Sequence, residues 1–127
     1  MVKSIKIKNL KKSLDWSQKT VLVTGGNGFL GSNVVNILKE KNVKDIIIPS
    51  SKIHDLRKIE NCRDVVKNVD IIFHLAAHVG GIGLNREKPG ELFYDNLMMG
   101  TQLLHEAQLA NVEKFVAVSY THLTLPT

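Results

Sequence analysis

The stretch Val21–Gly31, VLVTGGNGFLG, decides the fold that this chain of 127 residues is expected to adopt. Thr20–Thr24, which begins one residue before this stretch, is a short β-branched run and predicts a buried strand that ends at glycines. Leu30–Lys41 follows with apolar residues at helical spacing and predicts a helix. A strand that passes through glycines into a helix predicts a phosphate-binding turn, because the N–H groups and positive dipole end of the helix attract phosphate oxygens.

The turn satisfies two related glycine spacings. Gly26, Gly28 and Gly31 fit G-x-G-x-x-G, and Gly25, Gly28 and Gly31 fit G-x-x-G-x-x-G. A Cβ would obstruct the turn at the first glycines, Gly28 should let the backbone approach a pyrophosphate, and Gly31 should let the helix pack close to the strand. The alternative is a structural turn without a ligand, but a strand–turn–helix context favours dinucleotide binding. The residues expected to contact the cofactor here are Gly25, Gly28, Phe29, Leu30 and Gly31.

Strands and helices alternate along the rest of the chain. Further strands are predicted at Asp45–Pro49, Val69–Ala76 and Glu113–Val118, and further helices at 56–68 and Glu91–Ala110. This alternation predicts parallel pairing through right-handed crossovers. The strands are continuously apolar, which predicts a sheet covered on both faces. We therefore expect an α/β fold, a Rossmann-type doubly wound parallel sheet truncated after about the fourth strand.

Composition limits the class of protein. No apolar run approaches the roughly 18 residues of a membrane helix, and the start lacks the apolar core of a signal peptide. Cys62 is the single cysteine and cannot form an internal disulfide, which favours a cytoplasmic location. The net charge is +5, and six lysines precede position 20. Trp16 is the single aromatic residue among them, too few to stack the bases of a nucleic acid, so we interpret residues 1–18 as a solvated basic leader or short helix outside the main fold and expect no nucleic-acid partner.

The end of the second predicted strand bears on the identity of the cofactor. An acid usually stands there and binds the ribose 2′-hydroxyl of NAD. This chain instead has Pro49 followed by Ser50, Ser51 and Lys52. Two hydroxyls and a lysine suit the 2′-phosphate of NADP better, so NADP is favoured, with NAD and an ordinary loop as the alternatives.

These motifs together resemble a known family. TGGNGFLG, then Asp55-Leu56, then His74-Leu75-Ala76-Ala77 are similar to the extended short-chain dehydrogenase/reductase superfamily, the NAD-dependent epimerase/dehydratase family, from Thr20 to about Val118. Within it the chain resembles the GDP-L-fucose synthase group. The residues that carry this narrower resemblance are Val79-Gly80-Gly81-Ile82, Asn85, Pro89 and Phe93-Tyr94-Asp95-Asn96.

The resemblance implies roles for particular residues. Asp55 and Leu56 would border the adenine, while Leu75, Ala76 and Ala77 would line the cofactor. The residues implied near the nicotinamide and sugar are Val79, Gly80, Gly81 and Ile82, with Asn96 helping to organise the active site. It further implies a GDP-sugar substrate and a homodimer for the full-length protein.

Several of these residues have simpler interpretations. Asp55 could cap the next helix, Asn96 could be a satisfied buried amide, and His74 is more typical of a packed core histidine. His78 adjoins the implied nicotinamide site but matches no catalytic position. No Cys/His cluster has the spacing of metal ligands, so no metal site is expected.

The catalytic residues that the resemblance implies are absent. The family uses a Ser or Thr after the fourth strand and a Tyr-x-x-x-Lys, whose tyrosine is the general acid/base; here Tyr120 has no such lysine. The last ten residues, VSYTHLTLPT, match one reading frame of a transposon-end sequencing adapter. We interpret residues 119–127 as a non-native tail, which codons unlike the adapter in the source DNA would contradict. Residues 19–118 are then the N-terminal part of the dinucleotide domain, expected to be inactive alone.

Three functional hypotheses follow. The first is a GDP-L-fucose synthase-like enzyme that epimerises GDP-4-keto-6-deoxymannose at positions 3 and 5 and reduces its ketone with NADPH. The second is a UDP-sugar 4-epimerase or dehydratase of the same superfamily. The third is a non-catalytic NAD(P)-binding protein that lacks the Tyr/Lys pair.

Overall fold

The computed structural model describes residues 14–76 and 89–118. In this part of the chain a four-stranded parallel sheet has the order β2-β1-β3-β4. The strands are β1 (Thr20–Thr24), β2 (Asp45–Ile47), β3 (Ile71–His74) and β4 (Lys114–Ala117), and the helices are η1 (Trp16–Gln18, 3₁₀), α2 (Phe29–Glu40), α3 (Ile59–Val65) and α5 (Pro89–Leu109). The predicted parallel α/β sheet is confirmed.

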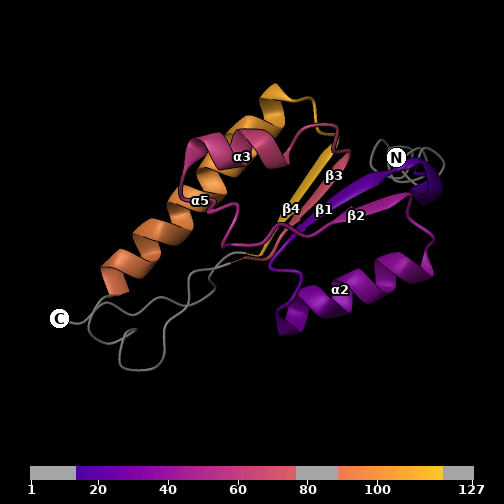
Figure 1. Ribbon diagram of the computed structural model, residues 1–127, viewed down its shortest axis with the longest axis horizontal. Helices are drawn as coiled ribbons and strands as arrows, with labels where there is room; N and C mark the ends of the chain where they lie inside the picture. Colours follow the sequence, from indigo (N-terminus) through magenta and orange to yellow (C-terminus); the bar gives the residue numbers. More distant parts are fainter. Residues whose placement is uncertain (1–13, 77–88, 119–127) are drawn as a thin grey trace, which may run out of the picture.

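The helices form a layer on each side of the sheet (Figure 1). Helix α2 covers one face, and α3 and α5 lie together on the other. The chain adds β2 on one side of β1 and then crosses to add β3 on the other side. This reversal makes a switch point between β1 and β3, where open α/β sheets bind ligands beyond the carboxyl ends of their strands.

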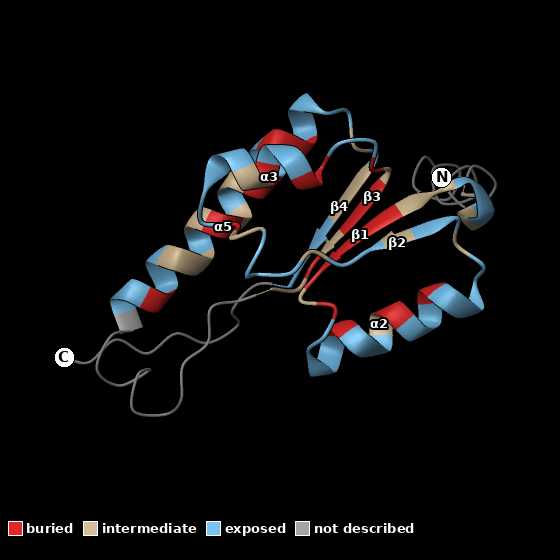
Figure 2. Cartoon of the chain, in the orientation of Figure 1, coloured by how far each residue is buried: buried red, intermediate tan, exposed pale blue. Residues whose placement is uncertain are grey.

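Two apolar clusters fill the spaces between these layers. Leu22 and Ile72 join Leu103 of α5 and Cys62 of α3 on one face. Val21, Val23 and Ile71 pack with Val35 and Leu38 of α2 on the other. Figure 2 shows that burial is concentrated in β1 and β3, whereas β2 and β4 are more exposed. The prediction of a sheet covered on both faces therefore holds for the inner strands and not for the edges.

Each of the three long crossovers ends in an asparagine with positive φ. Asn42, Asn68 and Asn111 have φ of 54°, 58° and 60°. Asparagine tolerates this left-handed conformation, which commonly ends helices. After α5, for example, the N–H of Val112 bonds to the carbonyl of Ala107 at 3.0 Å. These turns set where each following strand begins.

Some of the predicted strands and helices were too long. β2 ends at Ile47 because only Thr20–Leu22 of β1 pair with it, and Pro49 offers no N–H to extend the ladder. β3 begins at Ile71, one residue after Asp70, whose carboxylate accepts the Thr20 N–H at 2.8 Å. The predicted helix 56–68 is reduced to α3.

The leader prediction also needs correction at its end. Leu14 and Trp16 pack against the cluster beneath α2, and the Trp16 carbonyl accepts the Lys44 N–H at 3.2 Å. Residues 14–18 therefore contact the domain and do not lie outside it. Among the described helices, none is long and apolar enough to span a membrane.

Candidate functional site

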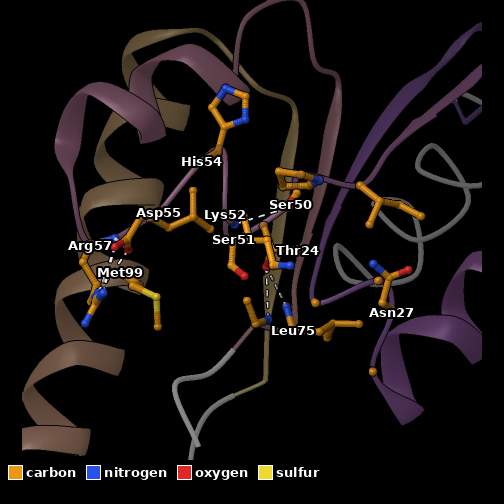
Figure 3. Close-up of a pocket in the computed structure, with 17 residues that line it drawn as sticks. Thr24, Asn27, Ser50, Ser51, Lys52, His54, Asp55, Arg57, Leu75 and Met99 are labelled. Carbon is orange, nitrogen blue, oxygen red and sulfur yellow. Dashed lines mark hydrogen bonds and ion pairs between the residues drawn. The ribbon is translucent and has the colours of Figure 1, made fainter.

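A cavity of about 690 Å³ lies beyond the carboxyl ends of β1, β2 and β3, within the size range of about 300–1,000 Å³ for cofactor sites. Figure 3 shows residues of two walls around it. Residues 24–28 and 75–76, from the ends of β1 and β3, form what we call the strand wall. Residues 48–52 and 54–57, which follow β2, form the loop wall, and Met99 of α5 completes the lining.

Two glycines at and just after the strand wall, Gly25 and Gly31, are required by close backbone contacts. Gly25 has φ +72°, and a Cβ there would lie 2.8 Å from the Ala76 nitrogen. A Cβ on Gly31 would lie only 1.8 Å from the Gly25 carbonyl oxygen. Gly25 therefore lets β1 turn against β3, and Gly31 lets α2 approach the turn, as the spacing predicted for both.

Gly28 is different, because no close contact within the described chain explains it. Its φ is −78°, and an added Cβ would meet only the Gly25 carbonyl oxygen, at an ordinary 3.4 Å. It lines the cavity and precedes α2, whose N-terminus has no side-chain cap. An uncapped helix start offers free N–H groups to an anion. A glycine with space around it, at the mouth of a cavity, fits the close approach of a phosphate.

Gly26 joins the two walls. It is buried, and a Cβ there would lie 2.8 Å from Cγ2 of Ile48. Sequence reasoning placed Gly26 in the turn but did not predict this contact. The packing holds the loop after β2 beside the glycine turn.

The loop wall carries the polar side chains. The Lys52 N–H donates to Ser50 Oγ at 3.3 Å, and the His54 N–H donates to the Ser50 carbonyl at 2.7 Å. These bonds fold residues 50–54 into a turn that brings Ser50, Ser51, Lys52 and His54 to the cavity. The three residues predicted to contact the cofactor here do lie together on the cavity wall, and His54 was not predicted.

Asp55 is held by a neighbour two residues away. The Arg57 guanidinium donates to both carboxylate oxygens, at 2.8 Å to Oδ2 and 3.0 Å to Oδ1, and the backbone N–H of Arg57 also donates to Oδ1 at 3.0 Å. The side-chain hydrogen bonds from Arg57 lower the pKa of Asp55 to about 2. Arg57 also lies 3.7 Å from Asp95 of α5. The carboxylate therefore stays ionised, and Arg57 is shared between two acids.

Asp55 does not cap α3 directly. The N-cap residue of that helix is Lys58, which makes no side-chain cap bond. Arg57 was missed by sequence reasoning, although the Asp-x-Arg spacing was available as a signal. Leu56, predicted beside the adenine, is buried and lines the cavity between these two charged residues.

The tips of β1 and β3 are tied together by the Thr24 hydroxyl. Its oxygen accepts the N–H groups of Leu75 and Ala76, each at 3.1 Å, and lies 2.7 Å from Nδ1 of His74. Thr24 and His74 are both buried. Leu75 and Ala76 line the cavity as predicted, but the part of Thr24 in holding them was not foreseen.

The remaining predicted residues are placed as follows. Phe29 and Leu30 are exposed at the start of α2, and with Gly31 they are not in the cavity lining. Asn96 is half-buried on α5 and interacts with other groups. The predicted residues Ala77, His78, Val79, Gly80, Gly81, Ile82 and Asn85 lie outside the described residues.

Among the described residues, this site has neither a cluster of metal ligands nor an ionised thiol. The described residues contain no group of three or more His, Cys, Asp or Glu that could hold a metal ion. Cys62 is buried under α5, where its thiol donates to the Leu56 carbonyl at 3.2 Å. Burial raises the pKa of this thiol to about 11, so it stays protonated and unreactive near neutral pH.

Comparison with known proteins identifies the family. Residues 21–123 match the NAD dependent epimerase/dehydratase family. The chain belongs to this family. The match includes the glycine turn and all four strands, and it runs past Val118 into the segment interpreted as a tail. The family and the position of the cavity support the assignment of this chain to enzymes that use a nicotinamide cofactor.

Individual relatives include enzymes named for GDP-sugars. The chain is 29% identical over 113 residues to GDP-mannose 3,5-epimerase 1 of Oryza sativa subsp. indica, covering 78% of this chain and 30% of that protein. It is 32% identical over 106 residues to GDP-L-fucose synthase of Dictyostelium discoideum, covering 80% and 33%.

A solved structure gives the same result. A GDP-L-fucose synthetase from Naegleria fowleri bound to NADP superposes with a TM-score of 0.68 and 30% identity, covering 80% of this chain and 31% of that one. The chain thus spans about a third of the length of these proteins. The comparable third contains the glycine turn and the cavity described above.

Proposed function

We propose that this chain is the cofactor-binding part of a cytoplasmic GDP-sugar epimerase/reductase that uses NADP, similar to GDP-L-fucose synthase. The observation that carries the choice of cofactor is the composition of the loop wall. Ser50, Ser51 and Lys52 stand where an acid would select NAD. The adjoining His54 adds a second basic side chain to the same wall.

The two carboxylates near this loop, those of Asp55 and Asp95, do not weaken the assignment of NADP. The Asp55 carboxylate is already bound by Arg57 on both oxygens, so it is a poor acceptor for a ribose 2′-hydroxyl. Arg57 is in turn neutralised by Asp55 and Asp95. Lys52 makes no ion pair among the described residues and is the basic side chain best placed to meet a 2′-phosphate.

The test is a titration of the chain with NADPH and NADH. We expect NADPH to bind more tightly, and Lys52→Ala to weaken NADPH about tenfold with little change for NADH, the size of one charge-assisted hydrogen bond. Lys44→Ala is the matched control, since Lys44 is exposed at the opposite end of β2. Equal affinity of the wild-type chain for both cofactors would contradict the assignment of NADP.

The substrate class is inferred from the relatives. Proteins named for GDP-mannose and GDP-L-fucose each match most of this chain, and a GDP-sugar is the substrate we propose for the whole protein. The reaction would be base-assisted epimerisation at the carbons beside a 4-keto group, followed by reduction of that ketone. NADPH, when bound, supplies the hydride. The described residues have the binding role: they hold the dinucleotide.

A second candidate is GDP-mannose 3,5-epimerase, favoured by the match to the rice enzyme of that name. The two candidates differ in net redox change. We expect the whole protein to oxidise NADPH when given GDP-4-keto-6-deoxymannose, followed as loss of absorbance of the reduced nicotinamide. Epimerisation of GDP-mannose without consumption of NADPH would favour the second candidate, and activity on neither would contradict both. A homodimer remains a prediction for the same protein, to be tested by its mass in solution.

A further inference from the structure

The hydroxyl of Thr24 has a fixed hydrogen-bonding capacity. A hydroxyl has one proton to donate and two lone pairs that accept. Both lone pairs of Oγ1 receive backbone N–H groups, from Leu75 and Ala76. The remaining contact, 2.7 Å to Nδ1 of His74, must therefore use the hydroxyl proton. Thr24 donates, and Nδ1 of His74 accepts.

This assignment fixes the state of the His74 ring. A ring nitrogen that accepts a hydrogen bond carries no proton, so a neutral His74 has its proton on Nε2. Burial lowers the pKa of His74 below its ordinary value, which favours the neutral form. Its described neighbours carry no charge: Thr24 on β1, the Phe115 ring on β4 at 6.1 Å, and Gly100 on α5.

We propose that His74 is a positioning residue of the cofactor cavity: as a neutral acceptor it orients the Thr24 hydroxyl so that both lone pairs hold the tip of β3. His74 is not part of the cavity lining, whereas Thr24, Leu75 and Ala76 are. It therefore acts through Thr24 and not by touching the cofactor. This role of His74 keeps the site in shape, and it does not depend on which cofactor or sugar is bound.

Protonation of His74 should loosen this arrangement. A proton on Nδ1 would need an acceptor, and Oγ1 could supply one only by giving up a backbone N–H. The Leu75 N–H keeps a second bond, to the Thr24 carbonyl at 3.1 Å. The Ala76 N–H is therefore the group expected to be released. Acid should open the tip of β3 where Ala76 contacts Gly25.

The first test measures the tautomer directly in the chain without cofactor. Long-range ¹H–¹⁵N spectra of the histidine rings report which nitrogen carries the proton. We expect His74 to be neutral at pH 7, with its proton on Nε2, and the amide of Ala76 to lose protection against hydrogen exchange on acidification before that of Val23 does. A proton on Nδ1 at pH 7 would overturn the proposal, whether or not the chain binds a cofactor.

The second test compares NADPH affinity across pH from about 8 to 4.5, a range that extends below the ordinary histidine pKa because burial lowers the pKa of His74. His74→Asn keeps an acceptor near the position of Nδ1 and cannot titrate. We expect it to bind like wild type at pH 8 and more tightly than wild type at pH 4.5. The ratio of the two affinities cancels titration of the NADPH phosphate. His105→Asn, on the exposed side of α5, is the control and should keep the wild-type profile.

Variants of Thr24 complete the test. Thr24→Val removes the hydroxyl at nearly constant shape and should weaken NADPH about tenfold at every pH, as expected when buried N–H groups lose a partner. Thr24→Ser restores the hydroxyl and should recover most of the affinity. A constant affinity ratio between wild type and His74→Asn from about pH 8 to 4.5 would overturn the proposal even if Thr24→Val fails to fold. Failure of the wild-type chain to bind NADPH would instead contradict the proposed function.

Discussion

The two walls of the cavity differ in the residues that form them. The strand wall consists of glycines, backbone amides and the Thr24 hydroxyl, which contacts the buried His74. The loop wall consists of exposed serines and charged side chains, with Asp55 and Arg57 paired at its far end. Backbone and glycine recognise what every dinucleotide has in common, a pyrophosphate, whereas charged side chains can distinguish one dinucleotide from another. The strand wall should thus control folding and binding, and the loop wall should control selectivity.

The largest expected effect is at Gly31 of α2, which packs against Gly25 of the strand wall. Gly31→Ala places a Cβ 1.8 Å from the Gly25 carbonyl oxygen, and both groups are backbone that cannot move aside without separating α2 from β1. We expect a loss of about 3 kcal/mol or more in the free energy of unfolding, measured by denaturant titration. A variant as stable as wild type would show that the turn is not packed as described.

Gly28→Ala should separate binding from folding. Its Cβ meets no atom of the chain closer than 3.4 Å, so the free energy of unfolding should fall by less than about 1 kcal/mol, as for other N-cap changes. The methyl group would nevertheless occupy the mouth of the cavity, and we expect NADPH and NADH to weaken equally, by about tenfold or more. Calorimetric titration of both cofactors measures this. Unchanged affinity would exclude Gly28 from the phosphate site.

The two walls should also respond to acid at different pH values. His74 has a lowered pKa in the folded chain, so the unfolded chain binds a proton first and stability falls as the pH drops below about 6.5. The pKa of Asp55 is lowered from 3.8 to about 2. Its contribution is therefore complete above pH 3.8 and is lost as the pH falls toward 2.

Single variants should remove these two steps separately. His74→Asn should flatten the first step, and Asp55→Asn should remove the second and cost about 0.5–1 kcal/mol at pH 7, a figure reduced for solvent screening. Unfolding followed by circular dichroism at a series of pH values checks both. If either variant abolished both steps, the two walls would not be independent.

The smallest effect concerns a glycine outside both walls. An added Cβ at Gly100 of α5 would lie 3.7 Å from Nε2 of His74, an ordinary contact. Gly100→Ala should therefore stabilise the helix by a few tenths of a kcal/mol, up to about 1 kcal/mol, through helix propensity. Thermal unfolding measures it. A destabilised variant would mean that the space between His74 and α5 has a function.

The strand wall was largely predictable from sequence, for a physical reason. Thr20–Thr24 was predicted with the boundaries that the structure has, and glycine spacing reports directly on backbone contacts that exclude a Cβ. The roles of Gly25 and Gly31 followed from that spacing. What was missed there, the Thr24–His74 bond, joins residues fifty positions apart, which no local pattern encodes.

The loop wall was less predictable. Ser50, Ser51 and Lys52 were singled out because they follow a strand end, and they line the cavity, but Arg57 and His54 were overlooked. Their importance depends on partners brought close by folding, such as Asp95 on α5 and Asp64 on α3. The packing of Leu14 and Trp16 was missed for the same reason. They follow a segment rich in lysine, and no local pattern predicts that these two apolar side chains contact the domain.

The central claim is that the glycine turn and the tip of β3 hold a dinucleotide. The most direct measurement is a titration of the ¹⁵N-labelled chain with NADPH, followed through its backbone amide resonances. We expect the largest shifts in residues 25–31 and 75–76, with smaller ones in residues 50–52. Shifts confined to the outer faces of α3 and α5, or no saturable shifts at all, would contradict the claim.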